Sequence, residues 1–332
     1  MNYNNLGETG IKISNIAFGA WAIGGWLWGG ADEEDAIKAL ERSFDVGMTT
    51  IDTAPAYGFG KSESLIKNVI KGRRDKFQIL TKYGLRWDTD EGVFYFETED
   101  MEGKRLKMHR YASRDSVIKE CEASLKRLGT DYIDLYQIHW PDTSTPIEDT
   151  MEGISKLIEQ GKIVAAGVCN YSVEDLQEAD KYVDIISNQV PFSMVKRDIE
   201  KDMIPYCLKT GKGILAYSPL QRGILTGKIN NDYQFNKGDN RPQTPYYKEP
   251  NLGRINKFLD DIRPIAEIYN ATLSQLIIHW TTRQPAILSV LVGARNVEQV
   301  KENVLAAELN VEDIHLKEIN EKLDSLVLDL NV

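Results

Sequence analysis

The sequence predicts an α/β fold in which a single (β/α)8 barrel of the TIM type occupies residues 1–332 as one domain. Three observations lead to it. Short apolar runs alternate with longer amphipathic segments, the runs number eight, and no linker rich in Pro, Gly or Ser divides the chain. Repeated βα units build a parallel sheet, and eight of them close it into a barrel. Length alone would also allow two ordinary domains.

The eight apolar runs are the predicted strands, because their composition is typical of short buried strands. In chain order they are 16–19, 50–52, 77–82, 133–139, 163–168, 185–189, 214–217 and 288–292.

The segments between these runs have apolar residues three and four positions apart, which predicts helices over 32–45, 113–128, 147–160, 173–182 and 297–306. Three of the helix starts carry a capping side chain, namely Asp32, Ser113 and Ser172. Before the first strand, the segment LGETGIKIS predicts a β-hairpin across the floor of the barrel.

Two connections are much longer than the others: residues 85–112 after the third strand and residues 221–252 after the seventh. Long irregular loops in compact domains usually cover a functional site, and otherwise they are mobile additions. Because both follow strands, both lie on the face where a barrel carries its catalytic groups. We therefore expect them to wall the pocket, and whether they close over a ligand is left open.

Composition limits the classes of partner. A net charge of −10 and a pI near 5.1 disfavour nucleic acid and anionic membranes, so a small molecule is the expected partner. The three cysteines are widely spaced without a CxxC motif, and the N-terminus lacks the blocks of a signal peptide. We expect a cytoplasmic protein without a membrane span. No spacing of His or Cys predicts a metal site, and charged outer helix faces make a monomer the default expectation.

Polar residues lie at or just past the C-terminal ends of three of the predicted strands: Asp52 and Tyr57 in IDTAPAYG, Lys82 in ILTKYG and His139 in LYQIHWPD. Each alone has a structural alternative, such as a strand-end cap, a solvated lysine, a turn aromatic or a core histidine. Because the C-terminal strand ends meet on the catalytic face, we expect the four to form one active site. Asp134, by contrast, alternates onto the outer face of its strand.

Longer motifs containing these residues resemble a known family. They are GAWAIGG, IDTAPAYG, LTKYG, SLKRLGTDYIDLYQIHWPD, GKIVAAGVCNYS, NQVPFS, LAYSPLQRGILTGK and VGARNVEQVKEN, which follow one another between about residues 5 and 310. Together they resemble the aldo-keto reductases, and above all the bacterial members with a W-x-x-GG start and a GAR ending. The resemblance implies NAD(P)H-dependent carbonyl reduction on a (β/α)8 barrel.

The chemistry of the four residues is compatible with that reaction. Hydride transfer to a carbonyl places negative charge on its oxygen, which then needs a proton donor. Tyr57 is the expected acid, and the ammonium of Lys82 is expected to lower its pKa. Asp52 would keep Lys82 charged and in place. The resemblance implies that His139 hydrogen-bonds the carbonyl oxygen and orients it, or assists proton delivery.

A cofactor must supply the hydride, because no side chain can. No G-x-G-x-x-G opens a helix after a strand, which disfavours a Rossmann site, and a flavin is an open alternative. The resemblance implies a nicotinamide cofactor whose carboxamide is held by Asn170 and Gln189 and whose ring stacks on Tyr217. The other implied cofactor contacts are Gly19, Ala20, Trp21, Asp52, Ser218, Leu220, Gln221, Arg222, Gly293, Ala294, Arg295, Gln299, Glu302 and Asn303.

Arg295 favours NADPH over NADH, since a guanidinium beside the adenosine ribose suits a 2′-phosphate; NADH is left as a second possibility. Cys169 departs from the family pattern, which usually has Ser before the Asn, so part of the carboxamide contact is in doubt. The expected substrate pocket is aromatic. Its predicted members are Trp21, Trp28, Tyr57, Trp87, His139 and Trp140, and aldehydes, ketoses and small ketones all fit this pattern.

Two other functions are compatible with these residues. The resemblance also extends to cofactor-bound, redox-sensing accessory subunits of potassium channels. Lys82 as a Schiff-base amine would instead predict a lyase or aldolase, which requires this lysine to be unpaired and partly neutral. Our principal hypothesis is reversible, NADPH-dependent reduction of aldehydes and ketones, with the physiological substrate and direction left open.

Overall fold

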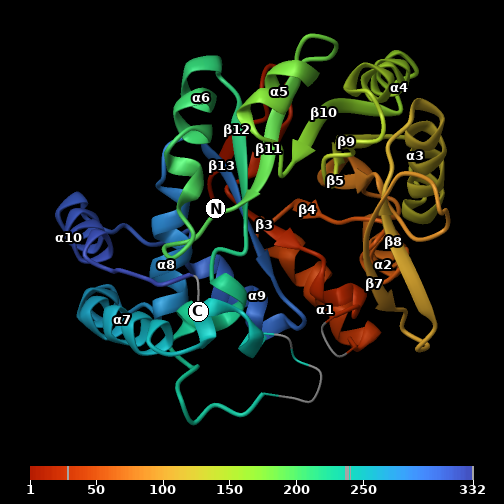
Figure 1. Cartoon of the computed structure of the whole chain (residues 1–332). Coiled ribbons are helices and arrows are strands. Elements are labelled where there is room, and N and C mark those ends of the chain that lie inside the picture. Colours follow the sequence, from red (N-terminus) through yellow and green to blue (C-terminus); the bar gives the residue numbers. More distant parts are fainter. Residues whose placement is uncertain (28–29, 236–238, 240, 331–332) are drawn as a thin grey trace.

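The computed structural model describes residues 1–27, 30–235, 239 and 241–330, and at its centre eight parallel strands form a closed barrel (Figure 1). Around the barrel the strand order is β10-β11-β12-β13-β3-β4-β5-β9. Their bounds are β3 Ile16–Gly19, β4 Thr50–Asp52, β5 Gln78–Tyr83, β9 Ile133–Ile138, β10 Ile163–Cys169, β11 Ile185–Pro191, β12 Gly213–Tyr217 and β13 Ile287–Gly293. The predicted barrel and all eight predicted strands are confirmed.

The helices lie around the outside of these strands (Figure 1). Their bounds are α1 Glu33–Asp45, α2 Lys61–Ile70, α3 Arg114–Leu128, α4 Ile147–Glu159, α5 Val173–Ala179, α6 Met203–Thr210, α7 Asn251–Ile268, α8 Leu273–Thr282, α9 Val297–Leu305 and α10 Asp313–Asp324. Within the described ranges, no helix has both the length and the apolar character needed to cross a bilayer.

The predicted caps are present. The side chains of Asp32, Ser113 and Ser172 each accept a hydrogen bond from the main-chain N–H three residues later, at the starts of α1, α3 and α5. The helix expected over 173–182 is shorter than predicted, since α5 ends at Ala179. The Asp180 side chain then accepts a hydrogen bond from the N–H of Ile185, which turns the chain into β11.

The floor of the barrel is closed by the predicted hairpin, formed by β1 (Tyr3–Asn5) and β2 (Lys12–Ser14). Leu6 and Ile13 from this hairpin are fully buried. They belong to one apolar cluster with inward side chains of the barrel strands, among them Leu80, Leu135 and Leu215. The lower half of the barrel is therefore a packed core, which leaves the opposite end for a site.

The connection after β5 is not the irregular loop that we expected. It folds into an antiparallel sheet of β6 (Leu85–Arg86), β8 (Arg105–Arg110) and β7 (Val93–Glu99), in the order β6-β8-β7. The β7 sequence, VFYFETE, is rich in β-branched and aromatic residues, which favour strands. In Figure 1 the β7–β8 hairpin extends beside α2 and α3.

In its described residues, the connection after β12 contains only short 3-10 turns, at Gln221–Thr226, Arg241–Gln243 and Pro245–Tyr247. A later residue of the same connection stabilises the first turn: the Tyr247 hydroxyl donates to the carbonyl oxygens of Gln221 and Arg222 at 3.1 Å each. The turn at Gln221–Thr226 is therefore held in place by a side chain from later in the same connection.

Candidate active site

A buried lysine on β5 is the centre of the polar cluster at the open end of the barrel. The Lys82 Nζ donates to Asp52 Oδ1 at 2.6 Å, to the carbonyl oxygen of Thr53 at 2.9 Å and to the Tyr57 hydroxyl at 3.1 Å. All three ammonium protons are thus used. Burial alone would lower the pKa of Lys82, but the Asp52 carboxylate, together with Tyr57 and Cys169, outweighs burial and raises it. Lys82 is therefore a charged and fully paired cation.

The second oxygen of Asp52 is held from across the barrel. Gln189 Nε2 on β11 donates to Asp52 Oδ2 at 2.7 Å, and Gln137 Nε2 on β9 lies 3.5 Å from the same atom. Gln137 was not among the predicted site residues, although its place in LYQIH puts it on the inner face of β9. These amides fix the carboxylate that fixes Lys82.

Tyr57 lies between two other predicted site residues. Its ring stacks on Trp21 with centroids 6.1 Å apart and meets His139 edge-on at 5.7 Å. Its hydroxyl oxygen accepts the bond from Lys82, and no acceptor for its own proton is found among the described residues. A carbonyl oxygen entering the barrel mouth would supply one.

The pKa of Tyr57 does not follow our expectation. We expected Lys82 to lower it below the ordinary value of 10, but burial raises the pKa to about 12, and the nearby ammonium offsets only part of that rise. The phenol consequently keeps its proton throughout the neutral range. Lys82 still matters, because it stabilises the tyrosinate that remains after the proton has left.

A close main-chain contact fixes the loop that carries Tyr57. A Cβ on Gly24 would lie 2.6 Å from the carbonyl carbon and oxygen of Tyr57, and a Cβ on Gly58 would lie 2.2 Å from the carbonyl oxygen of Gly24. Only glycine permits the loops after β3 and β4 to approach this closely. The glycines of GAWAIGG and AYG thus hold Tyr57 against Trp21.

His139 is a neutral imidazole at the mouth. Its main-chain N–H donates to Tyr83, and its carbonyl oxygen accepts from Asn170 Nδ2 at 3.1 Å. Burial, assisted by the charge of Lys82, holds the pKa of the ring well below its ordinary value. Neither ring nitrogen has a hydrogen-bond partner among the described residues, so the imidazole can donate to a ligand oxygen.

The residues expected to hold a nicotinamide also come together. The Tyr217 hydroxyl donates to Asn170 Oδ1 at 2.9 Å, and Cys169 pairs with Gln189 in the parallel register of β10 and β11. No described residue donates to Gln189 Oε1, which leaves an acceptor for a carboxamide N–H. Two amides and an aromatic ring suit a nicotinamide chemically. Burial raises the pKa of the Cys169 thiol, so it is an uncharged neighbour of this set.

The predicted phosphate loop has unusual backbone geometry. Ser218, Gln221 and Arg222 adopt left-handed conformations with φ of 57°, 43° and 56°. Such conformations in non-glycine residues are strained and concentrate at ligand sites, and successive main-chain N–H groups in such turns can bind anions. Leu220, the fourth predicted member of this loop, packs partly buried against the core.

The predicted adenosine contacts lie around the start of α9. Gln299 Oε1 accepts from the N–H of Arg295 at 2.8 Å, and Asn303 Nδ2 donates to the carbonyl oxygen of Gly293. The carbonyl oxygen of Glu302 accepts from Gln275. Gly293 pairs with Gly19 of β3, which joins this region to the predicted contacts after the first strand. Ala20 and Ala294 are buried in the core, so only their main chains could reach a ligand.

Aromatic rings line the side of the mouth that faces the β6–β8–β7 sheet. Trp87 contacts Phe59 at 5.3 Å, and Trp140 contacts Tyr95 at 5.4 Å. Trp87 and Trp140 were predicted, whereas Phe59 and Tyr95 were not, and the predicted Trp28 lies outside the described residues. The expected aromatic wall is therefore assembled from several loops and from β7.

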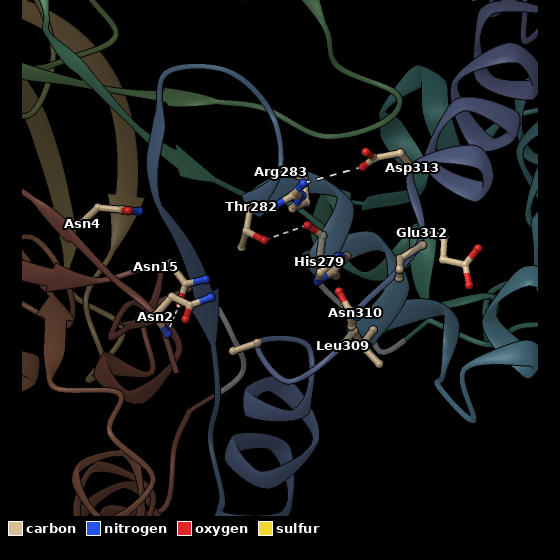
Figure 2. A pocket seen from close by; sticks show the side chains of 12 residues that line it. Asn2, Asn4, Asn15, His279, Thr282, Arg283, Leu309, Asn310, Glu312 and Asp313 are labelled. Atoms are coloured by element: carbon tan, nitrogen blue, oxygen red, sulfur yellow. Dashed lines mark hydrogen bonds and ion pairs between the residues drawn. The ribbon is translucent and has the colours of Figure 1, made fainter.

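A separate polar cavity of about 560 Å³ lies at the floor of the barrel. Figure 2 shows Asn2, Asn4 and Asn15 on one side of it, with His279, Arg283 and the segment leading to α10 on the other. It contains none of the predicted site residues, and the floor of such a barrel usually serves stability. In the described part of the chain, no group of three or more His, Cys, Asp or Glu side chains could hold a metal ion.

Sequence comparison gives consistent matches over almost the whole chain. The model of the Aldo/keto reductase family matches residues 15–324. Aldo-keto reductase YhdN of Bacillus subtilis is 36% identical, over 99% of this chain and 96% of its own length. The NADH-specific methylglyoxal reductase of Escherichia coli is 33% identical, over 97% of this chain and 98% of its own.

Two further matches extend the range of names. A putative voltage-gated potassium channel subunit beta of Schizosaccharomyces pombe is 33% identical, over 97% of this chain and 92% of its own. Among solved structures, the glycerol dehydrogenase AKR11B4 of Gluconobacter oxydans superposes with a TM-score of 0.87 at 34% identity, covering 96% of this chain and 94% of that one.

Proposed function

Since this chain belongs to the aldo/keto reductase family, whose members are NAD(P)H-dependent oxidoreductases of carbonyl compounds, we propose that it reduces aldehydes and ketones with NADPH and that Tyr57 is the general acid. The observation that carries the proposal is the Tyr57 hydroxyl. It accepts a 3.1 Å hydrogen bond from a charged, buried lysine, while its own proton has no acceptor among the described residues.

A bound reduced nicotinamide would supply the hydride. The residues of the chain would stabilise and protonate the negatively charged oxygen that hydride transfer produces. His139, as a neutral donor, and Tyr57 would bind the carbonyl oxygen together. Tyr57 would then transfer its proton to that oxygen, and Lys82 would stabilise the tyrosinate. Asp52, held by Gln189 and Gln137, would keep the ammonium in position. Asn170, Gln189 and Tyr217 would hold the nicotinamide end.

The preference for NADPH rests on Arg295. Its exposed side chain forms no ion pair among the described residues, so its guanidinium is available to a 2′-phosphate at the start of α9. Asn296 caps this helix, whose N-terminal dipole adds to the attraction for anions. A relative named for NADH specificity makes NADH the rival cofactor, and parallel titration of the two cofactors distinguishes them.

The test of the reaction is NADPH oxidation with a panel of small aliphatic and aromatic aldehydes and ketones, run beside a fluorescence titration of NADPH binding. Turnover together with binding supports the proposal. Binding without turnover across the panel would instead favour a cofactor-bound accessory protein, as the name of the channel-subunit relative suggests. Absence of NADPH and NADH binding would overturn the cofactor assignment.

The Schiff-base alternative is contradicted at Lys82. An amine nucleophile must be partly neutral, but the Asp52 carboxylate raises the pKa of Lys82 and all three of its protons are engaged. A lyase or aldolase reaction through this lysine is therefore not proposed.

A further inference from the structure

A β-bulge in β7 changes the direction of one side chain at the barrel mouth. Phe94 pairs with His109 and Phe96 pairs with Met108, so Tyr95 is an extra residue without a partner in β8. Bulges re-aim side chains and are frequent beside active sites. Phe94 packs against His109, whereas Tyr95 contacts both Phe96 and Trp140. The bulge thus directs two consecutive aromatic rings inward, Tyr95 onto Trp140 and Phe96 onto Trp26, while Phe94 stays exposed.

The contacts of Tyr95 place its ring next to the carbonyl-binding residues. Its ring centroid lies 5.4 Å from that of Trp140, which directly follows His139. The Arg110 guanidinium lies 5.0 Å from the Tyr95 centroid, a cation–π contact. The ring therefore contacts both β8 and the loop after β9.

The hydroxyl of Tyr95 makes no hydrogen bond to a described residue, although the side chain is partly buried. Burial, together with the neighbouring Cys169, Tyr57 and Tyr95, raises the pKa of Tyr217. The hydroxyls of Tyr57 and Tyr217 each form a hydrogen bond within the site, whereas Tyr95, beside Trp140, forms none with a described residue.

We propose that Tyr95 donates a hydrogen bond to a second oxygen of the substrate, on the carbon beside the reacting carbonyl. This inference rests on the proposed function. With the carbonyl oxygen at Tyr57 and His139, the Tyr95 ring, tilted against Trp140, would bring its hydroxyl to the adjoining part of the substrate. The preferred substrates are therefore α-hydroxy and α-oxo carbonyl compounds, and plain alkyl carbonyls of the same size are poorer ones.

The test compares two ketones of equal size, hydroxyacetone and 2-butanone, in which a hydroxyl replaces a methyl group. We expect the wild-type enzyme to prefer hydroxyacetone. Tyr95→Phe keeps the ring contacts but removes the donor, so kcat/KM for hydroxyacetone should fall about tenfold while that for 2-butanone changes by less than about twofold. Phe94→Leu, on the outer face of the same strand, is the matched control and should leave the ratio of the two values unchanged.

The outcomes separate this inference from the proposed function. An unchanged ratio in Tyr95→Phe, or an equal fall for both ketones, would overturn the role of the hydroxyl while the reductase activity stands. Wild-type turnover of 2-butanone without turnover of hydroxyacetone would overturn it as well. NADPH binding without turnover of either ketone or of any aldehyde in the panel would overturn the proposed function itself.

Discussion

Two ion pairs of equal length lie on opposite faces of the barrel wall. On the inner face, Lys82 Nζ is 2.6 Å from Asp52 Oδ1; on the outer face, Arg74 Nη2 is 2.6 Å from Asp134 Oδ2. Both pairs are largely buried. They differ in what else the cation binds.

In the outer pair, the remaining hydrogen bonds of both partners go to other groups of the protein. The other hydrogen bonds of Arg74 go to Thr130, Tyr132 and the carbonyl oxygen of Phe77, and Asp134 also accepts from the N–H of Ile79. The inner cation instead reaches the Tyr57 hydroxyl, whose proton has no acceptor among the described residues. A buried ion pair by itself therefore indicates little about function; an unused proton beside it is the informative feature.

The largest expected effect is on the inner pair. Lys82→Met removes the charge that stabilises the tyrosinate and releases Asp52, so kcat/KM should fall about 10³-fold. The measurement is steady-state NADPH oxidation on protein shown to be folded by circular dichroism. Lys76→Met, which removes an exposed lysine paired with Asp75, is the control. A loss below about tenfold in Lys82→Met would remove the distinction between the pairs.

The outer pair should affect stability without affecting the reaction. Arg74→Leu leaves Asp134 buried and unpaired, so the free energy of unfolding should fall by about 3 kcal/mol, with turnover per folded molecule unchanged. Urea denaturation measures the first quantity. The double variant Arg74→Leu/Asp134→Leu should recover much of the loss, since apolar replacement of both partners is often neutral. A specific loss of turnover would show that the outer pair has a catalytic role.

A third buried carboxylate, Glu120, differs from Asp52 and Asp134 because its cation is farther away. Glu120 accepts hydrogen bonds from the N–H of Gly84, but the Arg86 guanidinium is 3.6 Å from it. Burial raises the pKa of Glu120 to about 7, and Arg86 offsets only part of the rise.

The sign of the pH effect follows from that pKa. Between about pH 4.5, near the pKa in the unfolded chain, and about pH 7, the folded protein holds a proton that the unfolded chain has released. The free energy of unfolding should therefore fall as the pH rises through this window, by up to about 3 kcal/mol. Glu120→Gln should remove this part of the pH dependence in urea denaturation. An unchanged pH profile in the variant would contradict the assignment.

The smallest expected effect concerns the exposed cation at the cofactor's far end. Arg295→Ala should weaken NADPH binding about tenfold, because one exposed contact to a 2′-phosphate is lost, and should leave NADH binding unchanged. Fluorescence titration gives both Kd values. Lys301→Ala, on the same helix and paired with Glu298, is the control. Equal weakening of NADPH and NADH binding would show that Arg295 does not bind the 2′-phosphate.

The strand ends could be predicted because alternation and apolar runs mark a parallel barrel. Asp52, Lys82 and Asp134 each fall on the expected face. The β6–β8–β7 sheet was missed, although VFYFETE carries a strand signal, because the acidic and glycine-rich residues around it resemble a loop. The pKa of Tyr57 could not be predicted either, because it depends on how far burial exceeds the effect of Lys82. The position of Tyr95 depends on a bulge, which sequence periodicity does not reveal.

The most direct test of Tyr57 as the acid is the rate of NADPH oxidation in a single turnover by Tyr57→Phe loaded with NADPH. The variant keeps the ring contacts with Trp21 and His139 and loses only the hydroxyl. The account predicts an NADPH Kd within about threefold of wild type and a rate about 10²- to 10³-fold lower. A rate within about tenfold of wild type would contradict it, because another group would then protonate the carbonyl oxygen.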